Sequence, residues 1–548
     1  MRRILIIPLV VSLLSCRGTD LLKLRIEMSG ADLFNSFRAE NVRLNPIGEL
    51  VLDLRKARGE ARGLVETDII DLLDLQNNSI APGSGIQSIE LTCWASAPEG
   101  GKVELYTRCG DSFFDQQAWS PWQKVPELLA TIERPAGRYI QARVELMADD
   151  PDNSPRLSGL DLCGIFTPAA AEGLDSVSVA LFDNPVIVSS PIKFACERMD
   201  QPAVREFAQR NRLAELVAEC KSEMDTLVKV LHWVARIRNT RHHSFAGRDY
   251  PWDVREIVSY DSGGVPSIEG HCMSYAVVYI TALTGLGFTA RHWADQGFRF
   301  ADHEVVEAWS SSLGKWVYFD PSLDHYYADK ATGQPLSILE LHSVFVDTFF
   351  RNGETLRMPM NRQRERVRAV GGRNVPIEYV SGGYAYGRPN PDYDWGWLHG
   401  YLACGFMRLT TRNDFHSRKE PWFPHFGQGV HDFDCFLSWS DQKTPVSDKI
   451  TRFSERERDF YWTLNQAQIK ARRAGPRVLE LEFGQSMPFF KDLLVYIDDT
   501  EQAISGSGFT WKLHEGENRL SVVPRNEWGR TGIPASLKLF LKQRGKNG

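Results

Sequence analysis

The stretch from 268 to 287, IEGHCMSYAVVYITALTGLG, places a cysteine between a glycine and a long apolar run. The run contains no charged residue, which is typical of a helix buried in a core. Cys272 would lie in the first turn of that helix, two residues after Gly270, whose missing Cβ allows a tight approach. There the helix dipole and the free N–H groups would stabilise a thiolate and a developing oxyanion. Taken alone, however, Cys272 is more typical of a buried apolar residue, because free cysteines are among the most buried residues.

Two downstream residues supply the other groups that a cysteine nucleophile needs. His303 begins the alternating run HEVVEAW, and Asp320 closes the run KWVYFD just before a proline. A hairpin turn over SSLG would make these runs neighbouring antiparallel strands and bring His303 beside Asp320. Asp320 would then orient the imidazole, and His303 would deprotonate the thiol. Singly, His303 is an ordinary strand-end histidine and Asp320 a turn former, so only their joint order favours catalysis.

This order resembles the transglutaminase-like superfamily. The matching elements, over roughly residues 220 to 330, are Gly270-x-Cys272 with Tyr275 and Ala276, GLGFTARHW, His303 with Glu307, Gly314-x-Trp316 and Asp320-Pro321. The resemblance implies a papain-like core with Cys272 as nucleophile, His303 as general base and acid, and Asp320 as the orienting group. Family members act on amide bonds as proteases, transglutaminases or peptide:N-glycanases, and some have lost activity. Glu304 departs from the pattern, because many members place an aromatic or small residue there, and this leaves the substrate class open.

The length of 548 residues and the changes in periodicity predict several domains. Alternating runs at both ends are typical of antiparallel β-sandwiches, and helical periodicity dominates the segment before Cys272. We therefore expect an α+β transglutaminase-like (papain-like) core flanked by two β-sandwiches. The expected divisions are a lipoprotein signal peptide over 1–15, an N-terminal β-sandwich over 20–168, the catalytic domain over 195–370, an aromatic- and His-rich extension over 371–470, and an immunoglobulin-like β domain over 471–545.

The extension shows no clear period, and we expect loops and short strands that cover the neighbouring domain. Its aromatic residues could form flat faces for sugar rings, or they could pack as a lid or filler over the core. The residues that we expect to contact substrate, there and in the core, are Trp252, Tyr275, Glu304, Tyr386, Trp395, Trp397 and His399.

The first residues, MRRILIIPLVVSLLSC, combine two arginines with an apolar segment too short to span a bilayer, as in an export signal. The end, LLSC, resembles a bacterial lipoprotein processing box, which implies cleavage before Cys16 and a lipid on that cysteine. The alternative is an ordinary secretory signal with a chance cysteine. We expect a membrane-anchored protein of the periplasm or cell surface. If disulfides form, Cys196 with Cys220 and Cys404 with Cys435 are candidates that the sequence does not decide between.

The sequence gives no sign of a cofactor or a nucleic acid partner. The formal net charge is −6, the histidines lack the spacing of a zinc site, and no phosphate-binding glycine loop precedes a helix. The expected function is a thiol enzyme that forms a thioester and cleaves or transfers an amide-type bond of a peptide, glycopeptide or glycan-linked substrate. The alternative is a glycan-binding or polysaccharide-processing surface lipoprotein whose transglutaminase-like core is inactive or repurposed. Oligomeric state and the choice between hydrolase and transferase stay open.

Overall fold

The computed structural model describes residues 12–13, 22–53, 61–73, 85–133, 135, 137–150, 153–167, 176–240, 251–296, 302–349, 376–390, 406–418, 435–439, 452–502 and 508–542. The chain is multidomain and mostly β-sheet, as the sequence predicts. It divides into two compact units, the first formed by Met1–Pro191 with Asn465–Gly548 and the second by Ile192–Leu464. The first unit is therefore discontinuous in sequence, and it contains both ends of the chain.

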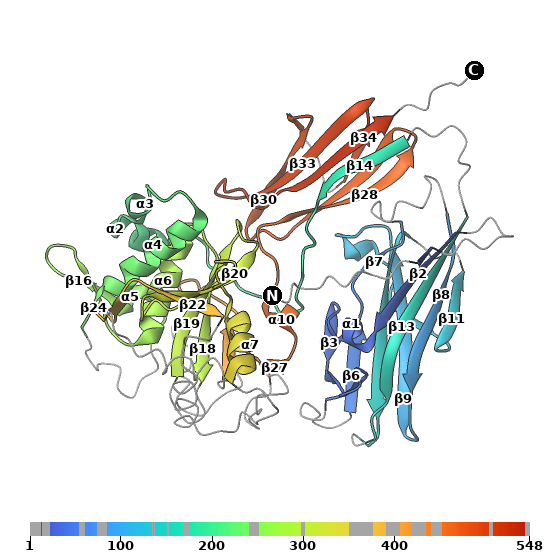
Figure 1. Cartoon of the computed structure of the whole chain (residues 1–548), viewed down its shortest axis with the longest axis horizontal. Coiled ribbons are helices and arrows are strands. Elements are labelled where there is room, and N and C mark those ends of the chain that lie inside the picture. The colour runs from blue at the N-terminus through green and yellow to red at the C-terminus, as the bar shows by residue number, and fades with distance from the viewer. Residues whose placement is uncertain are drawn as a thin grey trace. The chain divides into compact units, whose positions relative to one another are not determined.

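The N-terminal β-sandwich packs two sheets over one apolar core (Figure 1). Leu160 and Leu162 of one sheet and Ile140 and Val144 of the other are fully or almost fully buried in this core, which confirms the period-two prediction. The first sheet contains β1 (Ser12–Leu13), β2 (Leu22–Ser29), β4 (Val42–Leu44), β5 (Leu50–Leu52), β8 (Gly85–Ser96), β11 (Leu129–Glu133) and β13 (Arg156–Thr167). The second contains β3 (Arg38–Glu40), β6 (Ala61–Glu66), β7 (Ile70–Asp71), β9 (Gly101–Gly110), β10 (Gln123–Val125) and β12 (Tyr139–Ala148). Helix α1 (Gly30–Phe34) and the 3-10 turn η2 (Gln116–Ala118) connect strands.

The first unit also contains a C-terminal β-sandwich. One sheet has the order β14 (Ser176–Asp183), β34 (Ala535–Lys542), β33 (Gly516–Asn526), β30 (Phe490–Ile497) and β31 (Thr500–Gln502), and the other has β28 (Ala467–Gly475), β29 (Val478–Gln485) and β32 (Gly508–Lys512). Leu520 and Val522 alternate with more exposed residues and point into the shared core. Strand β14 pairs antiparallel with β34, so a segment that precedes the second unit completes the sheet at the end of the chain.

The second unit is built on a mixed sheet whose centre is antiparallel. Its order is β20 (Lys315–Phe319), β19 (Asp302–Ser310), β18 (Ala290–Gln296), β25 (Phe406–Thr410), β26 (Phe436–Trp439) and β27 (Phe453–Ser454). The last three strands come from residues 371–470, so parts of this segment extend the sheet itself. Smaller sheets contain β15 (Arg238–Asn239), β16 (Val258–Tyr260) and β17 (Pro266–Ile268), then β21 (His325–Asp329) and β22 (Ile377–Ser381), then β23 (Tyr384–Ala385) and β24 (Arg388–Pro389).

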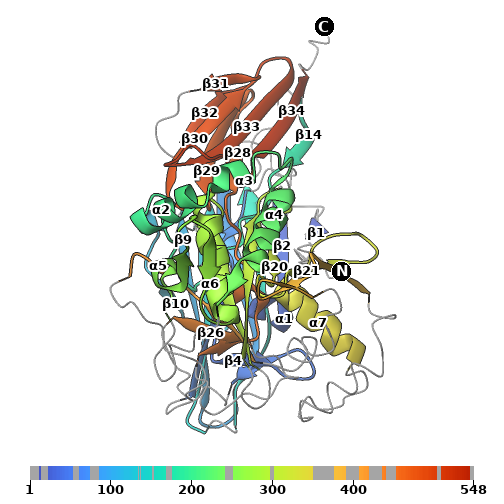
Figure 2. The same cartoon turned by 90° about the vertical axis from the view of Figure 1, so that its left-hand side faces the viewer.

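The helix α6 (Cys272–Gly285) is buried from Cys272 to Thr284. It packs against Val306 and Val317 of the sheet, and Figure 2 shows other helices around it. Its tyrosines have internal acceptors, since the Tyr279 hydroxyl donates to the Leu227 carbonyl at 3.0 Å. The helices of this unit are α2 (Pro202–Arg210), α3 (Leu213–Leu216), α4 (Glu223–Arg236), α5 (Val254–Ile257), α6, α7 (Ile338–Phe349) and α10 (Glu457–Phe460). The apolar run quoted first is thus a core helix.

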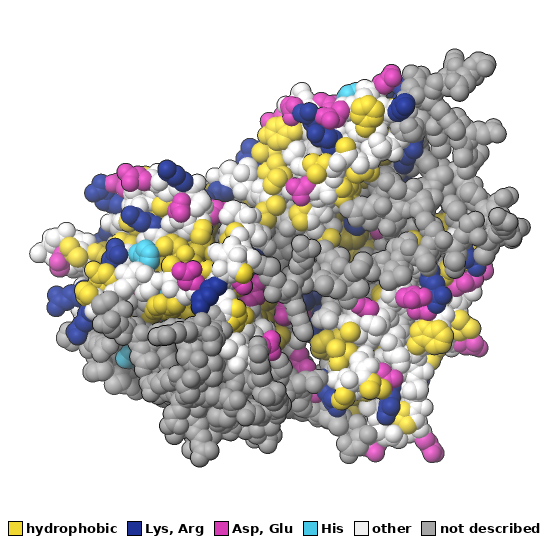
Figure 3. Space-filling view, in the orientation of Figure 1, with side chains coloured by type: hydrophobic (Ala, Val, Ile, Leu, Met, Phe, Trp, Pro, Cys, Tyr) yellow, Lys and Arg dark blue, Asp and Glu magenta, His cyan; other side chains and the backbone are white. Residues whose placement is uncertain are grey.

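Among the described helices, none is both long and apolar enough to cross a bilayer. On the face drawn in Figure 3, side chains of Lys and Arg are interspersed with those of Asp and Glu over the described surface. The visible charge is mixed, in agreement with the modest net charge of the chain.

Candidate active site

Cys272 is the first residue of α6, and the turn before the helix is tightly constrained. Gly270 has φ 121°, a value that side chains rarely adopt, and a Cβ at this position would lie 2.1 Å from Ser274 Oγ. The Asn239 side chain donates to the Gly270 carbonyl at 3.0 Å and fixes the turn. His271 caps the helix with extended backbone but without a side-chain hydrogen bond, so the first N–H groups are not capped by that residue. The thiol therefore lies at the positive end of the helix dipole.

His303 and Asp320 lie side by side, as the hairpin pattern predicts. Val306 pairs with Phe319 across β19 and β20, which sets His303 diagonally opposite Asp320. His303 Nε2 lies 2.6 Å from Asp320 Oδ2, and both side chains are buried. A side-chain hydrogen bond with Cys272 is among the contacts that raise the pKa of His303. Because Nε2 is occupied by Asp320, Nδ1 is the ring nitrogen left for the thiol. The structure thus brings together the three residues that the sequence singles out.

The electrostatics of the pair hold His303 in its protonated form. Burial by itself lowers the pKa of His303, but the charge and hydrogen bond of Asp320, together with Cys272, outweigh burial and raise that pKa well above its usual value. Burial raises the pKa of Asp320, yet His303, His325 and Ser322 more than compensate, and the pKa is lowered. An imidazolium held between a carboxylate and a sulfur is the partner that a nucleophilic thiolate requires.

The loop after β20 fixes the Asp320 carboxylate. Its Oδ1 accepts hydrogen bonds from the Ser322 N–H at 3.0 Å, the Ser322 hydroxyl at 2.7 Å and the Leu323 N–H at 3.0 Å. The other oxygen is left for His303. A carboxylate with this many donors cannot rotate freely, so the imidazole plane is fixed with it.

A second layer of buried polar residues lies behind Asp320. His325 Nδ1 is 4.0 Å from Asp320 Oδ2, and His325 packs against Tyr379 with 4.8 Å between ring centroids. His232 of α4 contacts the fully buried Asp324, with 2.5 Å between Nδ1 and Oδ1. A Cβ on Gly382 would lie 2.1 Å from Asp324 Oδ2, so only glycine fits over this pair. Sequence reasoning missed these residues; the repeated acidic and histidine positions in DPSLDH were the available signal.

Glu307, the acidic residue of the strand motif, has a structural role. It forms a fully buried ion pair with Arg291 at 2.7 Å and also accepts from Trp293 Nε1 at 2.6 Å and the Tyr461 hydroxyl at 2.8 Å. The Arg291 guanidinium stacks on the Trp316 ring, 3.9 Å from its centroid. The network ties β18, β19, β20 and the α10 region together on the face away from α6.

The residues expected to contact substrate lie in several environments. Trp252 and Tyr275 are almost fully buried: Trp252 meets the His292 ring edge to face at 4.7 Å, and the Tyr275 hydroxyl donates to the Ile237 carbonyl at 3.0 Å. Glu304 is buried and in ion-pair contact with His292. Their side chains therefore pack and pair inside the protein, and their contact with substrate stays a prediction.

Tyr386 packs against Tyr275 of the helix that carries Cys272. It is half-buried, it meets the Tyr275 ring edge to face at 5.5 Å, and its N–H donates to the Ser322 carbonyl at 2.8 Å. The β22–β24 segment is thereby joined to the loop that holds Asp320. The other predicted aromatic contacts, Trp395 and Trp397, with His399, lie outside the described residues, as does Cys16.

The other described cysteines and the described metal-ligating side chains do not form a second candidate site. Cys196 and Cys220 are free thiols, so this candidate disulfide does not form; Cys404, the candidate partner of Cys435, lies outside the described part. Burial and the neighbouring Asp414 raise the pKa of Cys196 to about 12, which makes it a poor nucleophile. No group of three His, Cys, Asp or Glu side chains in the described ranges is arranged to hold a metal ion.

No protein-family model and no curated protein matches the sequence significantly. Solved structures with weak likeness include accessory secretory proteins 1, 2 and 3 of Streptococcus pneumoniae, at 11% identity and TM-score 0.17 over 25% of this chain and 94% of the other. A family two carbohydrate esterase from Cellvibrio japonicus has 12% identity and TM-score 0.15 over 36% and 50% of the two chains. Red sea bream transglutaminase has 10% identity and TM-score 0.19 over 84% and 95%. Likeness this low supports no statement about function.

Proposed function

We propose that the protein is a thiol enzyme with a transglutaminase-like core that acts on an amide-type bond. The single observation that supports this function is the hydrogen-bonded chain from Cys272 through His303 to Asp320 at the start of a buried helix. Any one of these residues has an ordinary structural explanation. Three of them in one chain, with the histidine pKa raised by its two partners, form the arrangement that nucleophilic catalysis by cysteine needs.

The proposed reaction has two steps. The Cys272 thiolate adds to the substrate carbonyl, and the backbone N–H groups at the start of α6 stabilise the oxyanion. The C–N bond then breaks, His303 gives its proton to the leaving amine, and a thioester to Cys272 remains. In the second step water or an amine adds to the thioester, His303 accepts its proton, and the thiolate leaves. Water makes the protein a hydrolase, and an amine makes it a transferase. A peptide, glycopeptide or glycan-linked amide is the proposed substrate.

Native Cys272 should be alkylated by iodoacetamide faster than the other cysteines and faster than the unfolded chain at neutral pH. The physical reason is the positive charge of the His303 imidazolium at the sulfur, together with the N-terminus of α6. The rate can be followed by peptide mass spectrometry, with Cys220, half-buried in the same unit, as the internal reference.

The variant His303→Ala should bring the alkylation rate of Cys272 down to that of Cys220. If wild-type Cys272 reacts no faster than the denatured chain, the enzyme proposal fails. The protein would then be better described as a glycan-binding surface lipoprotein with an inactive or repurposed core. Binding of glycans without any acylation of Cys272 would support that alternative.

We also propose that the protein is exported and anchored by a lipid on Cys16, because the LLSC sequence follows an apolar export segment. The variant Cys16→Ser should move from the membrane fraction to the soluble exported fraction. The expected change is nearly complete, since one diacylated cysteine would supply the main membrane attachment. Fractionation with immunoblotting measures it. If wild type and variant partition alike, the lipid anchor is absent.

A further inference from the structure

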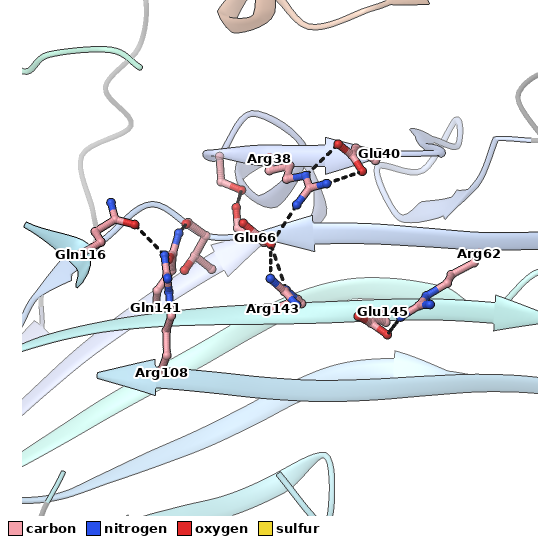
Figure 4. Close-up of polar contacts among 11 residues, drawn as sticks. Arg38, Glu40, Arg62, Glu66, Arg108, Gln116, Gln141, Arg143 and Glu145 are labelled. Carbon is pink, nitrogen blue, oxygen red and sulfur yellow. Dashed lines mark hydrogen bonds and ion pairs between the residues drawn. The ribbon is translucent and has the colours of Figure 1, made fainter. Parts of the chain in front are cut away.

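The outer face of the second sheet of the N-terminal sandwich carries an unusual set of arginines. Figure 4 shows Arg38, Arg62, Arg108 and Arg143 on or beside strands β3, β6, β9 and β12. Three of them pair with carboxylates: Arg38 with Glu40 at 2.7 Å, Arg62 with Glu145 at 2.6 Å, and Arg143 with Glu66 at 2.6 Å. We call this surface the Arg108 face.

Arg108 differs from the other three because its hydrogen-bond partners are neutral. Its Nε and Nη2 donate to Gln141 Oε1 at 2.9 and 2.7 Å, and Nη2 also donates to Gln116 Oε1 at 2.7 Å. Gln141 is almost fully buried and is held in turn by its own bond to the Thr67 carbonyl at 2.6 Å. In the described part of the chain, no carboxylate lies within ion-pair distance of Arg108. The guanidinium is thus oriented without being neutralised.

The environment of Arg108 makes this charge costly without a ligand. Burial lowers its pKa from the ordinary value; Glu66 opposes this effect and Arg143 adds to it. Four arginines face three glutamates in this group, so the surface has a positive excess in a chain whose net charge is −6. A partly desolvated cation with neutral partners is stabilised when an anion binds beside it. Its Nη1 edge makes no bond to the protein in the described contacts.

An aromatic ring completes the surface. The guanidinium carbons of Arg108 and Arg143 lie 4.8 and 4.1 Å from the centroid of the half-buried Trp122 ring. The stacking brings the two cations to one point on the sheet and fixes their planes. Because the indole is only half-buried, part of its apolar surface is also available to the C–H groups of a sugar ring, whereas an acidic peptide would require only the charges.

We propose that the Arg108 face binds an acidic polysaccharide, with the carboxylate of a uronic acid on the free edge of Arg108 and beside Arg143. The Arg108 face belongs to the first unit and Cys272 to the second, so binding should be unaffected by Cys272→Ala. This separation makes the proposal testable whether or not the protein is an enzyme.

The test is calorimetric titration of the full-length protein with polygalacturonate, alginate and hyaluronan. Arg108→Gln should weaken binding by at least about tenfold, because a charge-assisted bidentate contact is lost. The matched control is Arg62→Gln, which removes one charge from the same face at an exposed arginine that is already paired with Glu145; its affinity should stay within about twofold of wild type. An equal loss of affinity in both variants would mean that binding depends only on the overall charge of the surface, and would overturn the proposal.

A pair of ligands tests on the wild-type protein whether binding depends on the carboxylate of the sugar, in case Arg108→Gln does not fold. Methyl-esterified polygalacturonate keeps the sugar ring and loses the charge, so it should bind at least about tenfold more weakly than the free acid. Equal binding of the ester, equal binding of poly-glutamate, or no binding of any of the three acidic polysaccharides would overturn the proposal. Poly-glutamate binding in particular would point to an acidic protein partner.

Discussion

Replacement of Cys272 by alanine should abolish acyl transfer to the protein. With p-nitrophenyl acetate, the wild type should release a burst of about one equivalent of p-nitrophenol as Cys272 becomes acetylated, and the variant should show none. The rate constant for acylation should fall by about 10⁴-fold or more, since the nucleophile of the proposed covalent intermediate is lost. Stopped-flow absorbance measures the burst, and mass spectrometry places the acetyl group.

The matched control is Cys220→Ala, which removes another free cysteine from the same unit. Its burst should equal that of the wild type. Cys272 is 9% exposed and its side chain is small, so alanine should cost little stability there. A burst that survives in folded Cys272→Ala would show that the thiol is not the nucleophile, and the proposed mechanism would fail.

The variant Asp320→Asn should lower the acylation rate by about 10² to 10⁴-fold while leaving the thiol in place. Asp320 accepts from His303 Nε2 at 2.6 Å, which fixes the ring and leaves Nδ1 for Cys272. An asparagine amide can donate to Nε2 instead, which would move the proton to Nδ1 and leave no acceptor for the thiol proton. The pH profile gives a second readout. Because the Asp320 charge helps to raise the pKa of His303, its loss should shift the alkaline limb of activity to lower pH.

Asp324→Asn is the control for this variant. It alters a buried carboxylate four residues away that contacts His232, so it should destabilise the fold with only a small effect on the pH profile. In the wild type, the raised pKa of His303 contributes stability that is complete below the ordinary histidine pKa and is lost as pH rises through the raised value. An unchanged profile in Asp320→Asn would contradict the role of Asp320 as orienting group.

Periodicity predicted the elements whose pattern is local. The uninterrupted apolar run predicted α6, because that helix is buried on all sides. The alternating runs predicted the two sandwiches, because each of those strands buries one face. It did not show that β14 pairs with β34 or that β25 and β26 join the central sheet. Such pairings depend on partners far away in the sequence, and short strands have little pattern of their own.

The residues of the candidate site also divide into those that local sequence patterns predict and those that only long-range contacts bring together. Cys272, His303 and Asp320 could be chosen from the sequence because each stands at the start or end of a recognisable element, in an order with chemical meaning. His232 and Gly382 could not, since His232 is one polar position on a helix and its partner Asp324 comes from a loop about 90 residues later. Only the folded chain brings α4 and that loop together.

The pairing of β14 with β34 has a consequence for synthesis. About 350 residues separate the two strands, so at translation rates of about 5 to 20 residues per second β14 waits for roughly 20 to 70 seconds before its partner leaves the ribosome. Throughout that interval β14 has no strand to pair with. Its side chains Val177 and Val179 also lack the apolar core against which they later pack. The second unit can fold in the meantime, because its own strands and helices are already complete. A chain that stops before Ala535 would contain the complete second unit together with a β14 strand that has no β34 to pair with, and chaperones and proteases can recognise such incomplete copies.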